Sequence, residues 1–205
     1  MSEYTNKGFW NRFASIYDFT RKGDRSAYAS VFQNTASFMN TDMQVLEVAT
    51  GTGLIALQVA PFCNSIIATD FSENMIHVAN QKDKPDNLTF AVEDATKLSF
   101  ADKSFDMVII ANALHIMPEP EKALVEIRRV LKDDGVLIAP NFVRGNTFRE
   151  NISASFMKFF GFKIFANRNF DGYISFLSES EWAIIKTDCF KATFPLAFVA
   201  AKKSN

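Results

Sequence analysis

The spacing of apolar residues changes along the chain, and each change predicts a different kind of element. Residues 9–40 have apolar positions at helical spacing, which predicts two helices joined near RKGDR. From residue 44 onwards, short apolar runs alternate with segments of helical periodicity. The runs predict five strands: QVLEVA (44–49), SIIAT (65–69), NLTFAV (87–92), FDMVIIA (105–111) and GVLIAP (135–140).

Helical segments separate these strands. They are GLIALQVAP (53–61), SENMIHVANQK (72–82) and EPEKALVEIRRVLK (119–132). Strands that alternate with helices predict βαβ units, in which helices cover both faces of a parallel sheet.

The alternation ends after residue 140. Aromatic and apolar side chains there follow helical spacing, at Phe148, Ile152, Phe156, Phe159 and Phe160. SESE (178–181) has the spacing of a capping box and predicts a short helix. The final apolar runs flank Pro195 and predict two antiparallel strands, because so short a connection cannot join parallel ones.

Together these elements predict a doubly wound α/β fold. We expect a mostly parallel, seven-stranded sheet with an antiparallel C-terminal strand, helices on both faces and helical lid elements. The 205 residues suit one domain. Its expected parts are a helical cover (1–40), a cofactor-binding core (41–141), an aromatic-rich insertion over the substrate site (142–177), and a final helix with a β-hairpin (178–205).

Composition narrows the class of protein. A net charge of -1 without a basic cluster argues against nucleic acid as a partner. The chain has neither a signal-peptide pattern nor an apolar run of about 20 residues, so we expect a cytoplasmic protein without stable membrane insertion. Cys63 and Cys189 lie far apart, which favours free buried thiols, and no metal-ligand spacing occurs.

The segment VLEVATGTG (45–53) carries the first candidate chemistry. Gly51 and Gly53 follow a predicted strand and precede a predicted helix. Glycine permits positive φ and lets a ligand approach the main chain, so the loop predicts a nucleotide-type cradle at the carboxyl edge of the sheet. A glycine turn without a ligand is the plainer alternative.

Two cofactor classes fit this loop. GTGLIA also satisfies the dinucleotide pattern, with Asp70 near the spacing expected of an acid that holds a ribose. Against a nicotinamide enzyme, Glu47 would face a pyrophosphate unfavourably but suits a cationic amino group. A second acid, Asp94, follows the third strand, and no Tyr-x-x-x-Lys motif is present to supply hydride chemistry.

Four segments resemble a known family when they are taken in order. VLEVATGTG, IIATDFSENMI, VEDATKLSF and the stretch SFDMVIIANALHIMPEPEKALVEIRRVLKDDGVLI are similar to the motifs of class I S-adenosylmethionine-dependent methyltransferases. FASIYDFTR resembles the opening of the ubiquinone/menaquinone-methyltransferase-like (type 11) branch. Ala49 departs from the family pattern, because it occupies the first glycine position of the loop.

The resemblance implies S-adenosylmethionine as cofactor, with S-adenosylhomocysteine as product. The loop would hold the methionine end, Glu47 its ammonium and Asp70 the ribose hydroxyls. Phe71 and Met75 would line the adenine pocket, and Asp94 would bind the amino group of adenine. The complete implied set is Tyr17, Glu47, Ala49, Thr50, Gly51, Gly53, Asp70, Phe71, Met75, Asp94, Ala95 and Asn112.

The acceptor side is less defined. Asn112 ends the fourth strand near the expected methyl group, and His115 is the candidate general base; a histidine that only packs is the alternative, and carbon methylation would need no base. Aromatic residues lie before the first strand and after the fifth. They would line a pocket for an apolar or aromatic small molecule, pack in the hydrophobic core, or form a homodimer face. An NAD(P)-dependent oxidoreductase and a catalytically silent S-adenosylmethionine-binding protein are the rival functions.

Overall fold

The computed structural model describes residues 7–20, 22–145 and 165–204. Its helices, in chain order, are α1 (Lys7–Phe13), η1 (Ala14–Ile16), α2 (Tyr17–Thr20), η2 (Lys22–Asp24), α3 (Arg25–Ala36), α4 (Leu54–Val59), η3 (Ala60–Phe62), α5 (Glu73–Asn80), α6 (Pro120–Val130) and α8 (Phe170–Glu179). Its strands are β1 (Gln44–Val48), β2 (Ser65–Asp70), β3 (Leu88–Val92), β4 (Phe105–Ile110), β5 (Leu131–Ile138), β6 (Asn141–Phe142), β7 (Trp182–Phe190) and β8 (Leu196–Lys203).

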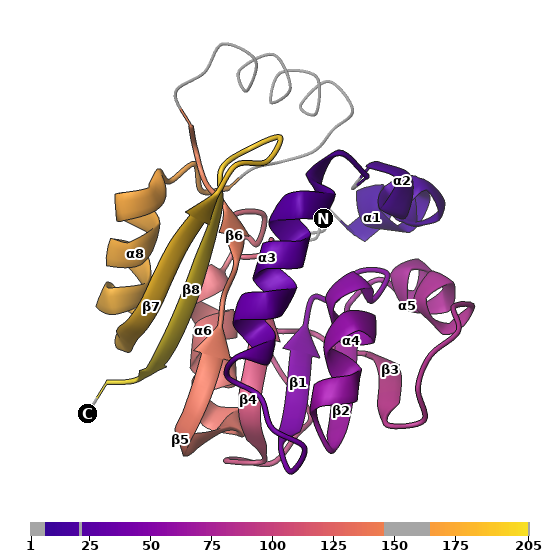
Figure 1. Cartoon of the computed structure of the whole chain (residues 1–205), viewed down its shortest axis with the longest axis horizontal. Coiled ribbons are helices and arrows are strands. Elements are labelled where there is room, and N and C mark those ends of the chain that lie inside the picture. The colour runs from indigo at the N-terminus through magenta and orange to yellow at the C-terminus, as the bar shows by residue number, and fades with distance from the viewer. Residues whose placement is uncertain (1–6, 21, 146–164, 205) are drawn as a thin grey trace.

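The strands form one sheet in the order β3-β2-β1-β4-β5-β8-β6, with β7 paired to β8 (Figure 1). β1 to β5 are parallel, whereas β8 runs antiparallel to β5, β6 and β7. The predicted doubly wound sheet with an antiparallel C-terminal strand is confirmed. The described residues give eight strands rather than seven, because the two-residue β6 also pairs with β8.

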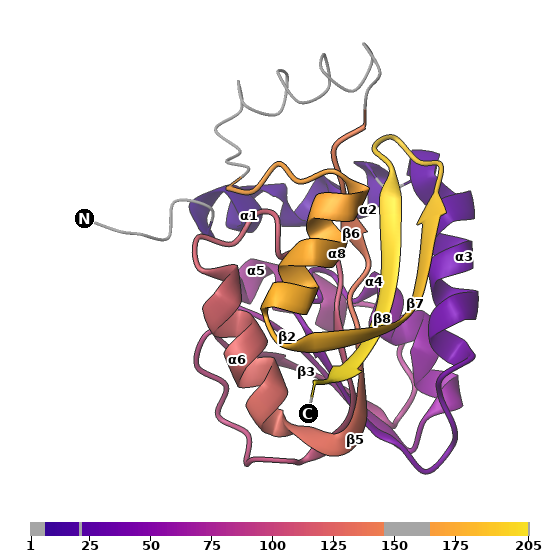
Figure 2. The same cartoon turned by 90° about the vertical axis from the view of Figure 1, so that its left-hand side faces the viewer.

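Helices cover both faces of the sheet, and the strand side chains alternate between them. In β4, Met107 and Ile109 belong to the core cluster that includes residues of α3, α4 and α5. Val108 and Ile110 belong to the cluster that includes residues of α6 and α8. Figure 2 shows α6 and α8 on one side of the sheet and α3 on the other. Continuous apolar runs arise because both faces of these strands are buried.

Local capping explains where two of the predicted helices begin. The Ser72 hydroxyl accepts a hydrogen bond from the Met75 amide at 3.2 Å and caps α5. Pro120 is the first residue of α6, where a missing N–H costs nothing, and Glu121 follows in the first turn. Both helices begin within one residue of the segments that periodicity predicts.

The prediction that a short helix begins at SESE (178–181) is wrong. Asn169 caps α8 by accepting a hydrogen bond from the Gly172 amide at 3.0 Å, so this helix begins at Phe170 and ends at Glu179. β7 follows at once from Trp182, its side chains alternating in burial. The segment from Phe148 to Phe160 lies outside the described residues.

Both cysteines are free thiols, as expected, but only Cys63 is buried, whereas Cys189 on β7 is exposed. The expectation of a buried thiol at Cys189 is therefore wrong, because β7 turns every second side chain to solvent. Within the described ranges, every helix is too short or too polar to span a bilayer.

Candidate cofactor-binding site

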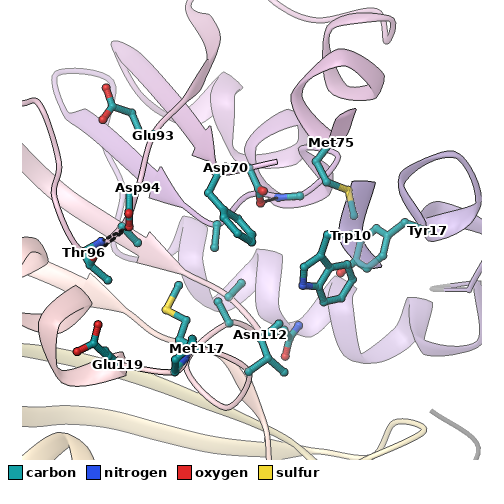
Figure 3. A pocket seen from close by; sticks show the side chains of 18 residues that line it. Trp10, Tyr17, Asp70, Met75, Glu93, Asp94, Thr96, Asn112, Met117 and Glu119 are labelled. Carbon is teal, nitrogen blue, oxygen red and sulfur yellow. Dashed lines mark hydrogen bonds between the residues drawn. The ribbon is translucent and has the colours of Figure 1, made fainter. Parts of the chain in front are cut away.

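A pocket lies where the first four parallel strands end (Figure 3). Its walls come from the segments that directly follow β1, β2, β3 and β4, and from the N-terminal cover formed by α1, η1 and α2. Nine of the predicted site residues line it: Tyr17, Ala49, Gly51, Asp70, Phe71, Met75, Asp94, Ala95 and Asn112. Carboxyl ends of parallel strands meet at one edge, which is why distant motifs converge here.

The glycine loop turns through left-handed backbone. Ala49, Gly51 and Gly53 have φ of 55°, 58° and 78°. This conformation is free for glycine and strained for alanine, so Ala49 stands in a position better suited to glycine. A Cβ at Gly51 would stand 3.7 Å from the Tyr17 ring, which lies across the loop.

Gly53 has a packing role that the sequence did not indicate. A Cβ there would lie 2.5 Å from the Phe90 ring, and Gly53 is absent from the pocket lining. Its missing side chain therefore makes room for β3, whereas Gly51 is the glycine that borders the pocket. Thr50, also predicted to bind the cofactor, is buried and likewise does not line the pocket.

Asp70 is the best-oriented acid in the pocket. Its Oδ2 accepts a hydrogen bond from the Gly51 amide and its Oδ1 one from the Ser72 amide, both at 2.9 Å. The Phe71 amide also interacts with this carboxylate. A carboxylate has about four lone-pair sites, so the fixed side chain keeps capacity for a further donor such as a hydroxyl group.

Burial raises the pKa of Asp70 to about 6, although the Ser72 and Gly51 amides and the Lys7 charge oppose this shift. The group is therefore mostly ionised at pH 7. Burial also raises the pKa of Glu47, to about 8; its neighbours Thr50 and Ala56 oppose the shift, and the charge of Asp70 adds to it. Glu47 is mostly protonated at pH 7.

Glu47 lies beneath the loop rather than on the pocket surface. It is only 1% exposed, and its Oε2 has no hydrogen-bond partner among the described residues. A buried polar atom without a partner is uncommon in proteins, and an ion or ligand that the site binds is one explanation. A cationic group at the loop would stabilise the ionised form of Glu47.

Asp94 is held by the turn that follows β3. Its Oδ1 accepts hydrogen bonds from the Thr96 amide at 2.9 Å and the Thr96 hydroxyl at 2.8 Å (Figure 3). The turn places Asp94 and Ala95 in the pocket lining together with Phe71 and Met75. These residues border the part of the pocket that the sequence assigns to adenine.

Asn112 has φ of 53° at the end of β4 and uses both ends of its amide. Its Nδ2 donates to the Tyr28 hydroxyl at 2.9 Å, and its Oδ1 accepts from the Phe142 amide at 3.0 Å. His115 does not line the pocket: its Nδ1 lies 2.9 Å from Asn141 Oδ1, and its ring meets Phe142 edge to face. A catalytic role for His115 stays a prediction.

Sequence reasoning missed several lining residues. Glu93, Met117 and Glu119 border the pocket without having been predicted, whereas Trp10, which also lines it, belongs to the aromatic residues before the first strand that were expected to form a pocket. The run after β4, IMPEP, was a signal for two of them, because loops after parallel strands build such sites. With Asp70 and Asp94, the two glutamates give the pocket four carboxylates, and the described residues that line it include no Lys, Arg or His.

Comparison with known proteins identifies this architecture. Residues 46–139 match the family model described as a methyltransferase domain. This core of the chain is therefore similar to methyltransferase domains. The matched residues include the glycine loop, Asp70, Asp94 and Asn112.

Two curated relatives and one solved structure are similar to this chain. The chain is 42% identical over 99 residues to a demethylmenaquinone methyltransferase of Renibacterium salmoninarum, covering 48% of this chain and 41% of the relative. It is 36% identical over 135 residues to a ubiquinone/menaquinone biosynthesis C-methyltransferase of Rickettsia typhi, covering 61% and 53%. The chain thus spans about half the length of these curated relatives.

The structural match is broader. A chain from the complex of a Haloferax volcanii methyltransferase with the Trm112 activator superposes with a TM-score of 0.78 at 17% identity, covering 96% of this chain and 98% of that chain. At this identity the match establishes the fold alone.

The family and fold imply S-adenosylmethionine as the cofactor, and the residues present fit it. Among the described residues, the charged groups of the lining are all acidic, and the unpaired Oε2 of Glu47 suits a cation at the loop. We assign Asp70 to the ribose hydroxyls, Asp94 and Ala95 to the adenine edge, and Gly51 with Glu47 to the methionine end as hypotheses.

Proposed function

We propose that the protein is an S-adenosylmethionine-dependent methyltransferase that acts on a small molecule. The observation that carries the proposal is the oriented carboxylate of Asp70 in a pocket whose charged lining residues, among those described, are all acidic. S-adenosylmethionine has a positive sulfur and a positive amino group, which an acidic pocket attracts. The pyrophosphate of NAD would meet no cationic side chain in the described lining, which disfavours the oxidoreductase.

When bound, the cofactor supplies an electrophilic methyl group that an acceptor atom takes by direct displacement. The chain contributes alignment and exclusion of water. Asp70 fixes the ribose, and Trp10 and Tyr17 of the N-terminal cover flank the pocket (Figure 3). Orientation alone supplies effective molarities of about 10⁵ M and above in favourable cases.

We propose a quinone-type aromatic ring as the acceptor. The names of both curated relatives place those proteins in menaquinone or ubiquinone methylation. Trp10, Ile116 and Met117 line the pocket near Asn112 and offer apolar surface to a ring. Attack by a ring carbon needs no histidine in contact with it, which agrees with His115 lying outside the lining.

Two binding measurements and one assay test the proposal. Calorimetric titration should show binding of S-adenosylhomocysteine and none of NAD; the reverse result would overturn it. Transfer of labelled methyl from S-adenosylmethionine should then be followed with quinols, phenols and small amines. Tight cofactor binding without transfer to any acceptor would favour the silent binding protein. A cytoplasmic location and a homodimer stay predictions.

A further inference from the structure

Asp18 joins the N-terminal cover to Thr52 of the glycine loop and to Lys82 beyond the end of α5. The Thr52 hydroxyl donates a short hydrogen bond to Asp18 Oδ1. Lys82 Nζ lies 2.6 Å from Asp18 Oδ2 and donates to the Thr52 carbonyl at 2.7 Å. These three residues, which we call the Asp18 clasp, close a triangle of polar contacts between elements far apart in sequence.

The clasp is more enclosed than an ordinary surface ion pair. Thr52 is fully buried, and the side chains of Lys82 and Asp18 are 22% and 41% exposed. Exposed ion pairs contribute little because water competes for both partners. Here each Asp18 oxygen has its own donor, and Lys82 has two acceptors, so the geometry is determined by more than one contact.

The residue before Asp18 is the one that reaches the pocket. Tyr17 lines it, with its ring 3.7 Å from the point where a Gly51 Cβ would stand. Trp10 packs against Tyr17 edge to face, with ring centroids 5.9 Å apart. Fixing Asp18 on Thr52 therefore also fixes these two rings beside the loop.

The other end of the cover is attached separately. Asn11 accepts a hydrogen bond from the Ser72 hydroxyl and, through its carbonyl, another from Asn74 at 3.0 Å; Lys7 pairs with Glu73 at 2.7 Å. These contacts lie at the start of α5, whereas Lys82 lies beyond its end. Of these described attachments, the clasp is the one nearest to Tyr17 in sequence.

We infer that Asp18 is a positioning residue that acts through Tyr17 on the methionine end of the bound cofactor. The ribose and adenine are assigned to Asp70 and Asp94, which the clasp does not touch. Loss of the clasp should therefore weaken ligands that carry the methionine part and spare those that lack it. This inference rests on the proposed function.

Two variants, each measured with two ligands, test the inference. Asp18→Asn keeps the side-chain shape and an acceptor for Thr52, and Lys82→Met keeps the aliphatic length without the charge. Calorimetry should show S-adenosylhomocysteine bound about fivefold to tenfold more weakly by each variant. Adenosine, which has the base and ribose alone, should change by less than about twofold. Asp133→Asn is the matched control, since it removes the exposed Lys103–Asp133 ion pair and should affect neither ligand.

The double variant, with Asp18→Asn and Lys82→Met together, should lose no more affinity for S-adenosylhomocysteine than the single variant that binds it more weakly. The reason is that each single change already breaks the Asp18 clasp. Equal losses for S-adenosylhomocysteine and adenosine would indicate general disorder of the site and overturn the inference, as would unchanged affinity for both. Failure of the unaltered protein to bind S-adenosylhomocysteine would instead overturn the proposed function. If Asp18→Asn does not fold, Lys82→Met carries the test.

Discussion

The Asp70 carboxylate accepts a hydrogen bond from the Gly51 amide at 2.9 Å, although 19 residues separate them in sequence. The second carboxylate oxygen holds the Ser72 amide, which lies at the start of α5. One side chain therefore fixes the glycine loop and the end of β2 relative to each other. The acid assigned to the ribose also builds the surface on which the methionine end would lie.

Replacement of Asp70 by alanine should weaken S-adenosylhomocysteine binding by tenfold or more. The variant loses charge-assisted hydrogen bonds of about 1.5–3 kcal/mol, and the Gly51 amide loses its partner. Calorimetric titration measures the effect. Asp42→Ala, at an exposed aspartate before β1, is the control and should bind normally. An unchanged dissociation constant for Asp70→Ala would show that the ribose assignment is wrong.

The buried Glu47 predicts stability that decreases as pH rises. Its pKa in the folded protein, about 8, exceeds the ordinary value of 4.5, so the folded state binds the proton more tightly than the unfolded state. The resulting stabilisation is complete below pH 4.5 and is lost as pH rises through about 8. Urea unfolding of the ligand-free protein between pH 5 and about 9 should show this decrease.

The unfolding free energy of the Glu47→Gln variant should depend markedly less on pH over the same window. Comparing the two proteins cancels the contributions of titrating groups that do not interact with Glu47, whereas Asp70, whose charge raises the pKa of Glu47, itself titrates lower, near 6. Parallel curves for the two proteins would contradict the assignment of this titration to Glu47.

The acidic lining predicts a preference between substrate and product. S-adenosylmethionine has one more positive charge than S-adenosylhomocysteine, and that charge is worth about 1 kcal/mol near a carboxylate in a solvated site. S-adenosylmethionine should therefore bind about fivefold more tightly than S-adenosylhomocysteine at low salt. The difference should shrink near 1 M salt, where the Debye length is only ~3 Å. Glu119→Gln removes one lining charge and should reduce the difference.

Ala49 predicts an unusual stabilising substitution. Its φ of 55° costs an alanine about 1 kcal/mol that a glycine does not incur. Ala49→Gly should therefore raise the unfolding free energy by about 0.5 kcal/mol, after the greater chain entropy of glycine is subtracted. The same change at Ala29, exposed on α3, should instead lower it by about 1 kcal/mol. Urea unfolding distinguishes the two; destabilisation at Ala49 would contradict the strain argument.

Periodicity predicted most of the sheet because strands buried on both faces have unbroken apolar runs. The predicted strand at 65–69 corresponds to β2 with one residue added at its end. β7 was missed over most of its length because some of its exposed positions are apolar, such as Ile185, which is 47% exposed. The sequence therefore lacks a clear alternation of apolar and polar residues. The turn before β7 uses Glu181 at φ of 64°, a residue type that gives no glycine signal.

The site was predictable where its residues belong to one continuous motif. Gly51 lies in the loop after β1 and Asp70 ends β2, so the parallel pairing of these two strands brings them together. Trp10 reaches the pocket from the separate N-terminal cover, and which of the aromatic residues of that cover enters the pocket depends on tertiary packing. The packing of Gly53 against Phe90 is similarly a contact between elements distant in sequence.

The insertion of β8 between β5 and β7 affects how the protein is synthesised. Leu196 to Ala201 are all buried, so this late segment occupies an interior position in the sheet. While the ribosome still holds these residues, β5 presents an unpaired edge to the solvent. We expect a nascent chain arrested before residue 196 to be sensitive to protease and to bind chaperones, even though its entire binding pocket has already been translated.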